Sequence, residues 1–198
     1  MTVLRIVVTG GPGGGKTTAA DLLRRELGDR VVVVPEAATM LFGGGFPRRK
    51  EAPARRAAQV AIYHVQRNVE DVQLAAYPGR ILLCDRGTID GAAYWPDGPD
   101  GFFTALATTR QAELSRYDAV IFFESAASGG RHIESGNPIR IETIEEAAKL
   151  DKALVKLWSD HPRFFFVPND HSFFKKITLG LAAMESIISQ LSKADAQS

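Results

Sequence analysis

The sequence predicts an α/β protein with a doubly wound, mostly parallel five-stranded sheet and helices on both faces. Short apolar or β-branched runs alternate along the chain with segments of helical periodicity, which is the order expected of parallel strands joined by helices. A glycine-rich stretch stands between the first apolar run and the first helical segment. With 198 residues and no linker, we expect a single domain over residues 1–198.

The expected strands are five apolar runs. The second, at residues 31–34, consists only of valine and predicts a fully buried strand. The fourth and fifth are rich in phenylalanine, and Pro or an acidic residue ends several of the runs. The expected strands cover residues 3–9, 31–34, 81–84, 120–123 and 163–167.

The expected helices occupy the segments between and after these strands. Residues 17–27 have helical spacing at Ala19, Leu22, Leu23 and Leu27, and Thr143 with Glu146 has the spacing of a capping box at the start of a later helix. A last helix follows from Phe173. Between them we expect a long helix with an apolar stripe and a shorter helix near residues 103–114. The stripe comprises Ala58, Ile62, Val65, Val69, Val72 and Ala76.

The glycine-rich stretch, residues 10–17, fits the phosphate-binding pattern Gly-x4-Gly-Lys-[Ser/Thr]. Glycines let backbone N–H groups turn toward an anion, and the start of the following helix adds the positive end of its dipole. Lys16 is expected to reach the β- and γ-phosphates, and the Thr17 hydroxyl to ligate Mg²⁺. The nucleotide is expected to contact Gly11, Gly13, Gly14, Gly15, Lys16, Thr17, Thr18 and, near its base, Asn169 after the fifth strand.

Composition limits the partners. The net charge of +1 gives no global field that attracts nucleic acid or a membrane surface, and no apolar run has the length of a membrane span. Cys84, the single cysteine, lies in an apolar run, so no intrachain disulfide forms and a packed core thiol is expected. We therefore expect a soluble, unprocessed cytoplasmic protein. The sequence leaves its oligomeric state open.

Acidic residues follow three of the expected strands. Asp85 ends the third and is the expected second magnesium ligand, with Arg86 beside it to contact transferring phosphate or the acceptor. Glu124 follows the fourth strand in the same way, so the pattern alone leaves it as an alternative metal ligand. Glu36 follows the second strand, at the edge of the sheet where ligands bind in open α/β folds.

Two polar segments carry further basic residues. Residues 125–141 are too long for a simple turn and predict a lid over the phosphates, in which Arg131 and Arg140 stabilise charge in the transition state. A basic cluster, Arg48, Arg49, Lys50, Arg55 and Arg56, precedes and begins the long helix. It is able to attract an anionic substrate, but a solvated helix end is the favoured interpretation.

These motifs together resemble those of a P-loop kinase of the nucleoside and nucleotide kinase superfamily. More narrowly, the chain resembles the small AAA-like ATPase/kinase group that includes the ribosylnicotinamide kinase domain of bacterial nicotinamide-cofactor regulators. The adenylyltransferase motif of those regulators is missing, so the resemblance does not imply ribosylnicotinamide as the substrate of this chain. The resemblance rests on Thr9-Gly10-Gly11-Pro12 with Gly14 to Thr18, Val34 to Ala38, Asp85-Arg86-Gly87 with Asp90-Gly91 and Ala93 to Trp95, and Asn137 to Arg140.

The resemblance implies the roles of the remaining site residues. In deoxynucleoside kinases a Glu after the second strand acts as base on the acceptor hydroxyl, and Glu36 and Asp85-Arg86 stand at the matching positions. We therefore expect transfer of phosphate from ATP, with Mg²⁺, to a small hydroxyl acceptor such as a nucleoside. GTP is the alternative nucleotide. The alternative function is a nucleotide-binding switch or slow NTPase that acts through a protein or lipid partner.

Overall fold

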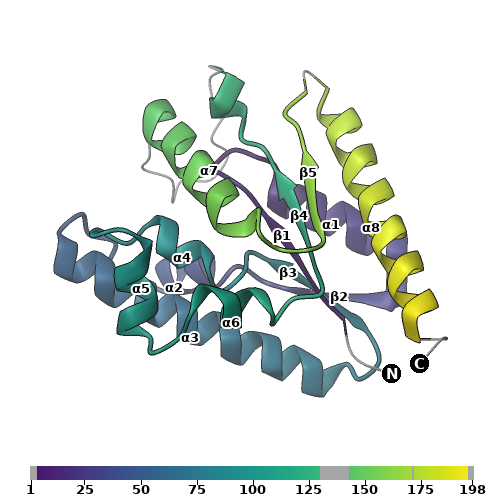
Figure 1. Cartoon of the computed structure of the whole chain (residues 1–198), viewed down its shortest axis with the longest axis horizontal. Helices are drawn as coiled ribbons and strands as arrows, with labels where there is room; N and C mark the ends of the chain where they lie inside the picture. Colours follow the sequence, from purple (N-terminus) through teal and green to yellow (C-terminus); the bar gives the residue numbers. More distant parts are fainter. Residues whose placement is uncertain (1–3, 130–142, 171, 196–198) are drawn as a thin grey trace.

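The computed structural model describes residues 4–129, 143–170 and 172–195. Within them, five parallel strands form a sheet in the order β2-β3-β1-β4-β5 (Figure 1). The α/β class and the parallel five-stranded sheet predicted from the sequence are confirmed. The strands are β1 (Arg5–Thr9), β2 (Val31–Val34), β3 (Ile81–Asp85), β4 (Ala119–Phe123) and β5 (Phe164–Val167).

Helices cover both faces of this sheet, with α1 and α8 on one side and α3, α4 and α7 on the other (Figure 1). None of the helices in the described part of the chain is long and apolar enough to cross a membrane. The helices are α1 (Lys16–Leu27), α2 (Ala37–Gly43), α3 (Ala52–Ala76), α4 (Asp90–Ala93), α5 (Pro99–Ala105), α6 (Arg110–Leu114), α7 (Ile144–Trp158) and α8 (Phe173–Asp195), with short 3₁₀ turns η1 (Gly28–Arg30) and η2 (Ala126–Gly129).

The core has two parts because successive side chains of a strand point to opposite faces. Ile6 of β1 packs in the cluster that contains Leu23 of α1 and Met184 of α8. Its neighbour Val7 packs in the other cluster, with Tyr63 of α3 and Trp158 of α7. Both faces of the central strand are therefore buried, as a doubly wound sheet requires. Cys84 of β3 is fully buried, and this burial raises the pKa of its thiol well above the ordinary value.

Two expectations about helices near this core need correction. The single helix expected near residues 103–114 is two short ones, α5 and α6, because Ala107 between them has a positive φ of 50° and Thr109 caps α6. The expected apolar stripe on α3 holds in part: Ala58 is buried and Val69 packs against the core, but Val72 is 63 % exposed. The buried side of that helix also carries Gln66 and Glu70 beside Tyr63.

The polar face of α3 is stable because its groups have partners. Arg116 donates to Glu70 at 2.7 Å, and the Tyr63 hydroxyl donates to Glu113 at 2.7 Å. A buried polar group costs little when it is hydrogen-bonded. Apolar periodicity carries no information about such partners, so the sequence pattern missed the polar part of the buried face.

The order of the strands corrects the expectation that residues 31–34 are fully buried, and it also positions the site. β2 lies at one edge of the sheet, so Val32 and Val33 are only partly buried. β3 lies between β2 and the central β1. The carboxyl ends of these three parallel strands therefore meet at one edge, and the segments that follow them lie close together.

Candidate active site

The loop after β1 leads into α1 through a left-handed residue. Gly15 is the N-cap of α1 with φ 77°, a conformation that side chains with a Cβ rarely adopt. Lys16 is 5 % exposed, and its Nζ donates to the carbonyl of Gly11 at 2.7 Å. The ammonium group is therefore folded over the loop, where a phosphate chain is expected to lie.

A buried carboxylate from α7 supports the same loop. Asp151 Oδ1 accepts the backbone N–H of Gly11 at 2.7 Å and that of Ser125 at 3.1 Å. A Cβ at position 11 would lie 2.4 Å from this oxygen, so the close approach requires glycine there. The Ser125 hydroxyl donates to the carbonyl of Pro12. Asp151 therefore joins the phosphate loop, the end of β4 and α7. No sequence motif indicated it.

Thr17 and Asp85, the two predicted magnesium ligands, lie in contact. Thr17 Oγ1 donates to Asp85 Oδ2 at 2.9 Å, while the other carboxylate oxygen, Oδ1, is buried and has no hydrogen-bond partner among the described residues. Burial and the charge of Glu36 raise the pKa of Asp85, against the opposing effects of Lys16 and Thr17. A cation beside the unpartnered oxygen would favour the ionised form.

This pair fits a magnesium site. Among the described residues no group of three or more His, Cys, Asp or Glu side chains could hold a metal ion. Mg²⁺ is commonly held by one or two carboxylates together with substrate phosphates and water, so it does not need such a cluster. Thr17 and Asp85 supply a hydroxyl and a carboxylate next to the phosphate loop.

Glu124, the alternative metal ligand, has a different set of partners. Its Oε2 accepts the backbone N–H of Asn169 at 2.8 Å, and its carbonyl accepts from Lys176. Glu124 thus ties the end of β4 to the segment after β5. The predicted contact of Asn169 with the nucleotide base stays a prediction.

Arg86 connects the ends of β2 and β3. Its Nε donates to Glu36 Oε1 at 2.6 Å and its Nη1 to Asp90 Oδ2 at 3.0 Å. It has a positive φ of 79°, which is uncommon for a residue with a side chain. Burial acts to raise the pKa of Glu36, but the charge of Arg86 and a hydrogen bond from Thr39 outweigh it and lower the pKa. Glu36 is therefore ionised at neutral pH.

Asp90 holds Arg86 in place. The Thr9 hydroxyl donates to Asp90 Oδ2 at 2.7 Å, and Trp158 Nε1 donates to Oδ1 at 2.6 Å. Both carboxylate oxygens are therefore engaged, which leaves Asp90 suited to positioning rather than to accepting a proton. Its role depends on partners from β1 and α7 that no local pattern reveals.

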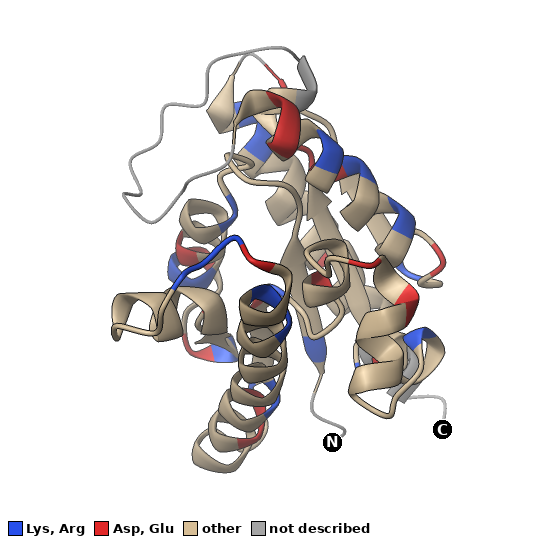
Figure 2. Ribbon diagram, turned by 90° about the vertical axis from the view of Figure 1, so that its left-hand side faces the viewer, with Lys and Arg blue, Asp and Glu red and all other residues tan. Residues whose placement is uncertain are grey.

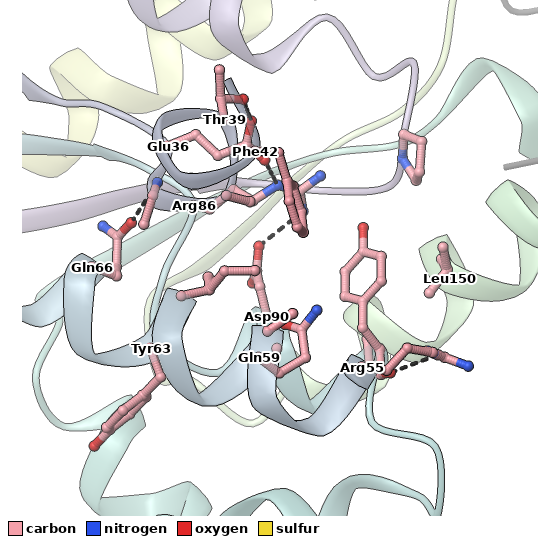
Figure 3. A pocket seen from close by; sticks show the side chains of 18 of the residues that line it. Glu36, Thr39, Phe42, Arg55, Gln59, Tyr63, Gln66, Arg86, Asp90 and Leu150 are labelled. Atoms are coloured by element: carbon pink, nitrogen blue, oxygen red, sulfur yellow. Dashed lines mark hydrogen bonds and ion pairs between the residues drawn. The ribbon is translucent and has the colours of Figure 1, made fainter. Parts of the chain in front are cut away.

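A cavity of about 580 Å³ extends from this cluster, as Figure 3 shows. Glu36, Thr39 and Phe42 lie on one side of it, and Arg55 and Leu150 lie on the other. Its volume is in the range of small-molecule sites. The predicted site residues on its wall are Lys16, Thr17, Glu36 and Arg86, whereas Gly11, Gly13, Gly14, Gly15, Thr18, Asp85 and Asn169 do not line it.

The predicted lid is described only in part. Ser125 and η2 belong to the described residues, but residues 130–142 do not. Arg131 and Arg140 both lie outside the described part of the chain, so their role in the transition state stays a prediction from the sequence.

Comparison with known proteins supports the interpretation of the phosphate loop. Residues 5–174 match a family model described as an AAA domain. A search of the curated proteins finds no match. The matched segment contains the phosphate loop, Asp85 and all five strands of the sheet. It covers well over half of the 198 residues. The chain therefore belongs to the AAA-domain family of P-loop proteins.

Proposed function

We propose that this protein transfers the γ-phosphoryl group of ATP, in the presence of Mg²⁺, to a hydroxyl group of a small nucleoside-like molecule. The supporting observation is the cavity of about 580 Å³ that begins at Lys16 and Thr17 and has Glu36 on its wall. An acceptor in this cavity would lie between the end of the phosphate chain and a carboxylate.

The phosphate loop and Lys16 would bind the triphosphate. Lys16 now donates to the Gly11 carbonyl, and a β- or γ-phosphate oxygen is the stronger acceptor for its charge. Thr17 and Asp85 would hold Mg²⁺, which would neutralise the charge that develops on the phosphate oxygens. The unpartnered Oδ1 of Asp85 supports this assignment.

Glu36 would orient the acceptor hydroxyl and take its proton. In the balanced reaction the hydroxyl oxygen bonds to the γ-phosphorus, the bond from that phosphorus to the bridging oxygen breaks, and ADP leaves. Because Arg86 helps to keep the pKa of Glu36 low, the carboxylate is a weak base for a free hydroxyl. The hydroxyl becomes acidic as its oxygen bonds to phosphorus, so Glu36 orients it first and accepts the proton late.

Arg86 would act both on Glu36 and on the phosphate that is transferred. It lines the cavity and carries its charge close to Glu36 and to the phosphate loop, since Nη1 also donates to the Gly10 carbonyl at 3.3 Å. When an acceptor approaches Glu36, Arg86 remains anchored by Asp90.

We place this reaction in the cytoplasm, in keeping with the free, buried Cys84.

A screen of hydroxyl acceptors tests the proposal. Formation of ADP or GDP is measured with Mg·ATP or Mg·GTP, with each of a panel of nucleosides and related small molecules, and without acceptor. We expect turnover that at least one acceptor stimulates about tenfold or more, with phosphate found on its hydroxyl. Turnover that no acceptor changes would support the nucleotide-binding switch instead.

A further inference from the structure

The basic cluster between α2 and α3 lines the cavity, and its members Arg49 and Lys50 are also exposed, in keeping with the solvated helix end favoured from the sequence. Arg48, Arg49 and Lys50 line the cavity in the segment that leads into α3, seen in blue in Figure 2. Arg55 of α3 and Lys149 of α7 line it as well. Arg56 alone of the predicted cluster turns away, to Asp97. Positive charge from three segments therefore surrounds one space.

This charge is poorly balanced. Glu146 is the carboxylate on this part of the wall, and its Oε2 is engaged with the backbone N–H of Thr143 at 2.8 Å. Across the described ranges, Arg49, Lys50 and Lys149 form no close ion pair, although the pKa of Glu146 is lowered by its hydrogen bond with the Thr143 backbone and by the charges of Lys50 and Lys149. The cations on this part of the wall outnumber its carboxylate, and net positive charge facing a cavity attracts an anionic ligand.

The triphosphate does not account for these cations. Lys16 and the loop amides would serve it, and Arg86 already pairs with Glu36 and Asp90. In Figure 3, Arg55 lies across the cavity from Glu36. An anion held by this basic wall would therefore belong to the acceptor, at a distance from the hydroxyl that faces Glu36.

The rest of the wall indicates what joins that anion to the hydroxyl. Phe42, Ile62 and Leu150 line the cavity and supply apolar surface suited to a flat ring. Arg48 lies over the Phe42 ring at 5.1 Å, so the aromatic and the basic surfaces are continuous. A ring, a hydroxyl and a distant anion are together the parts of a nucleotide.

We propose that the acceptor is a nucleoside monophosphate, whose phosphate monoester binds to Arg49 and Lys50 while a free hydroxyl faces Glu36. This inference rests on the proposed function and adds the class of acceptor. The γ-phosphoryl group moves to the hydroxyl oxygen of the acceptor, the hydroxyl proton passes to Glu36, and ADP leaves. The monophosphate of the acceptor is unchanged, so the product carries two separate phosphate monoesters.

The experiment compares four nucleosides with their 5′- and 3′-monophosphates as acceptors. We expect kcat/KM to be at least about tenfold higher for a monophosphate, since a charge-assisted hydrogen bond to phosphate contributes that much or more. The double variant R49Q/K50Q should remove this preference and leave the KM for ATP within about twofold. K152Q/K156Q removes the same charge from exposed positions of α7 outside the cavity and should keep the preference.

Each other result has a defined meaning. Nucleosides phosphorylated as well as their monophosphates would overturn the phosphate subsite and leave the proposed kinase standing. A diphosphate product would also overturn it, because the monophosphate would then lie at Lys16. If neither the nucleosides nor their monophosphates stimulate turnover, the proposed function fails. Calorimetry with the monophosphates at saturating Mg·ADP then tests whether the phosphate subsite exists. Binding that R49Q/K50Q abolishes supports it, and no binding to the wild type overturns it.

Discussion

Replacing Asp151 by alanine should loosen the phosphate loop without touching a residue that contacts nucleotide. The Asp151 carboxylate is 2 % exposed and holds the N–H groups of Gly11 and Ser125 through one oxygen. Alanine removes the acceptor and leaves both donors buried. Asparagine retains an oxygen at the same place, so D151N should recover most of what D151A loses.

The cost follows from the two orphaned donors. A buried donor without a partner costs about 1–3 kcal/mol, so D151A should lower the free energy of unfolding by about 2–6 kcal/mol. The substitution should also destabilise the protein through Lys176, which is 3 % exposed. Burial lowers the pKa of Lys176, and the charges of Asp151 and Glu124 oppose that shift, so D151A removes one of the two charges that favour the buried ammonium group. Nucleotide affinity should fall about tenfold, since the loop must then be ordered during binding.

Urea unfolding and calorimetry with Mg·ADP measure the two quantities. Asp21→Ala is the matched control, because its carboxylate is exposed on α1 and pairs with the surface residues Arg24 and Arg25 there. It should change the free energy of unfolding by less than about 0.5 kcal/mol. If D151A has both the stability and the affinity of this control, Asp151 does not support the loop.

Three further predictions concern neighbouring residues. Lys16→Ala should fold normally and lose most affinity for Mg·ATP in calorimetry, because the backbone of the loop remains while the charge near the β- and γ-phosphates is gone; unaltered affinity would contradict its assignment. Asp85→Asn should raise the Mg²⁺ concentration needed for half-maximal turnover, whereas Glu124→Gln should leave it unchanged; the opposite result would move the metal ligand to β4. Trp158→Phe removes the donor to Asp90 and should cost about 1–3 kcal/mol in urea unfolding. It should also lower kcat, as Arg86 loses its support; full activity would mean that Asp90 holds Arg86 without this bond.

Features that depend on local patterns were predictable. The phosphate loop needs glycines and a lysine at fixed spacing between a strand and a helix, and these lie within residues 10–17. The capping box at the start of α7 is equally local: Thr143 accepts from the Glu146 N–H, and Glu146 accepts from that of Thr143. Such interactions join residues only a few positions apart, so their spacing is visible in the sequence.

Features that depend on long-range partners were not predictable. Gly11 and Asp151 are 140 positions apart, and Trp158 reaches Asp90 across 68. Only the folded sheet and α7 bring such groups together. The basic cluster's place on the cavity wall was missed for the same reason: Arg49 and Lys50 are exposed, and only the placement of α3 and α7 shows that they line the cavity.

The most direct test of the proposed reaction is transfer of labelled γ-phosphate from ATP to the acceptor by wild-type protein and by Glu36→Gln. The substitution keeps the size of the side chain and removes the charge that orients the hydroxyl and takes its proton. The account predicts near-normal affinity for Mg·ATP and acceptor phosphorylation slowed by at least about tenfold, which is below the usual range for general base catalysis because positioning and metal carry much of phosphoryl transfer. Acceptor phosphorylation by Glu36→Gln at the wild-type rate would contradict it.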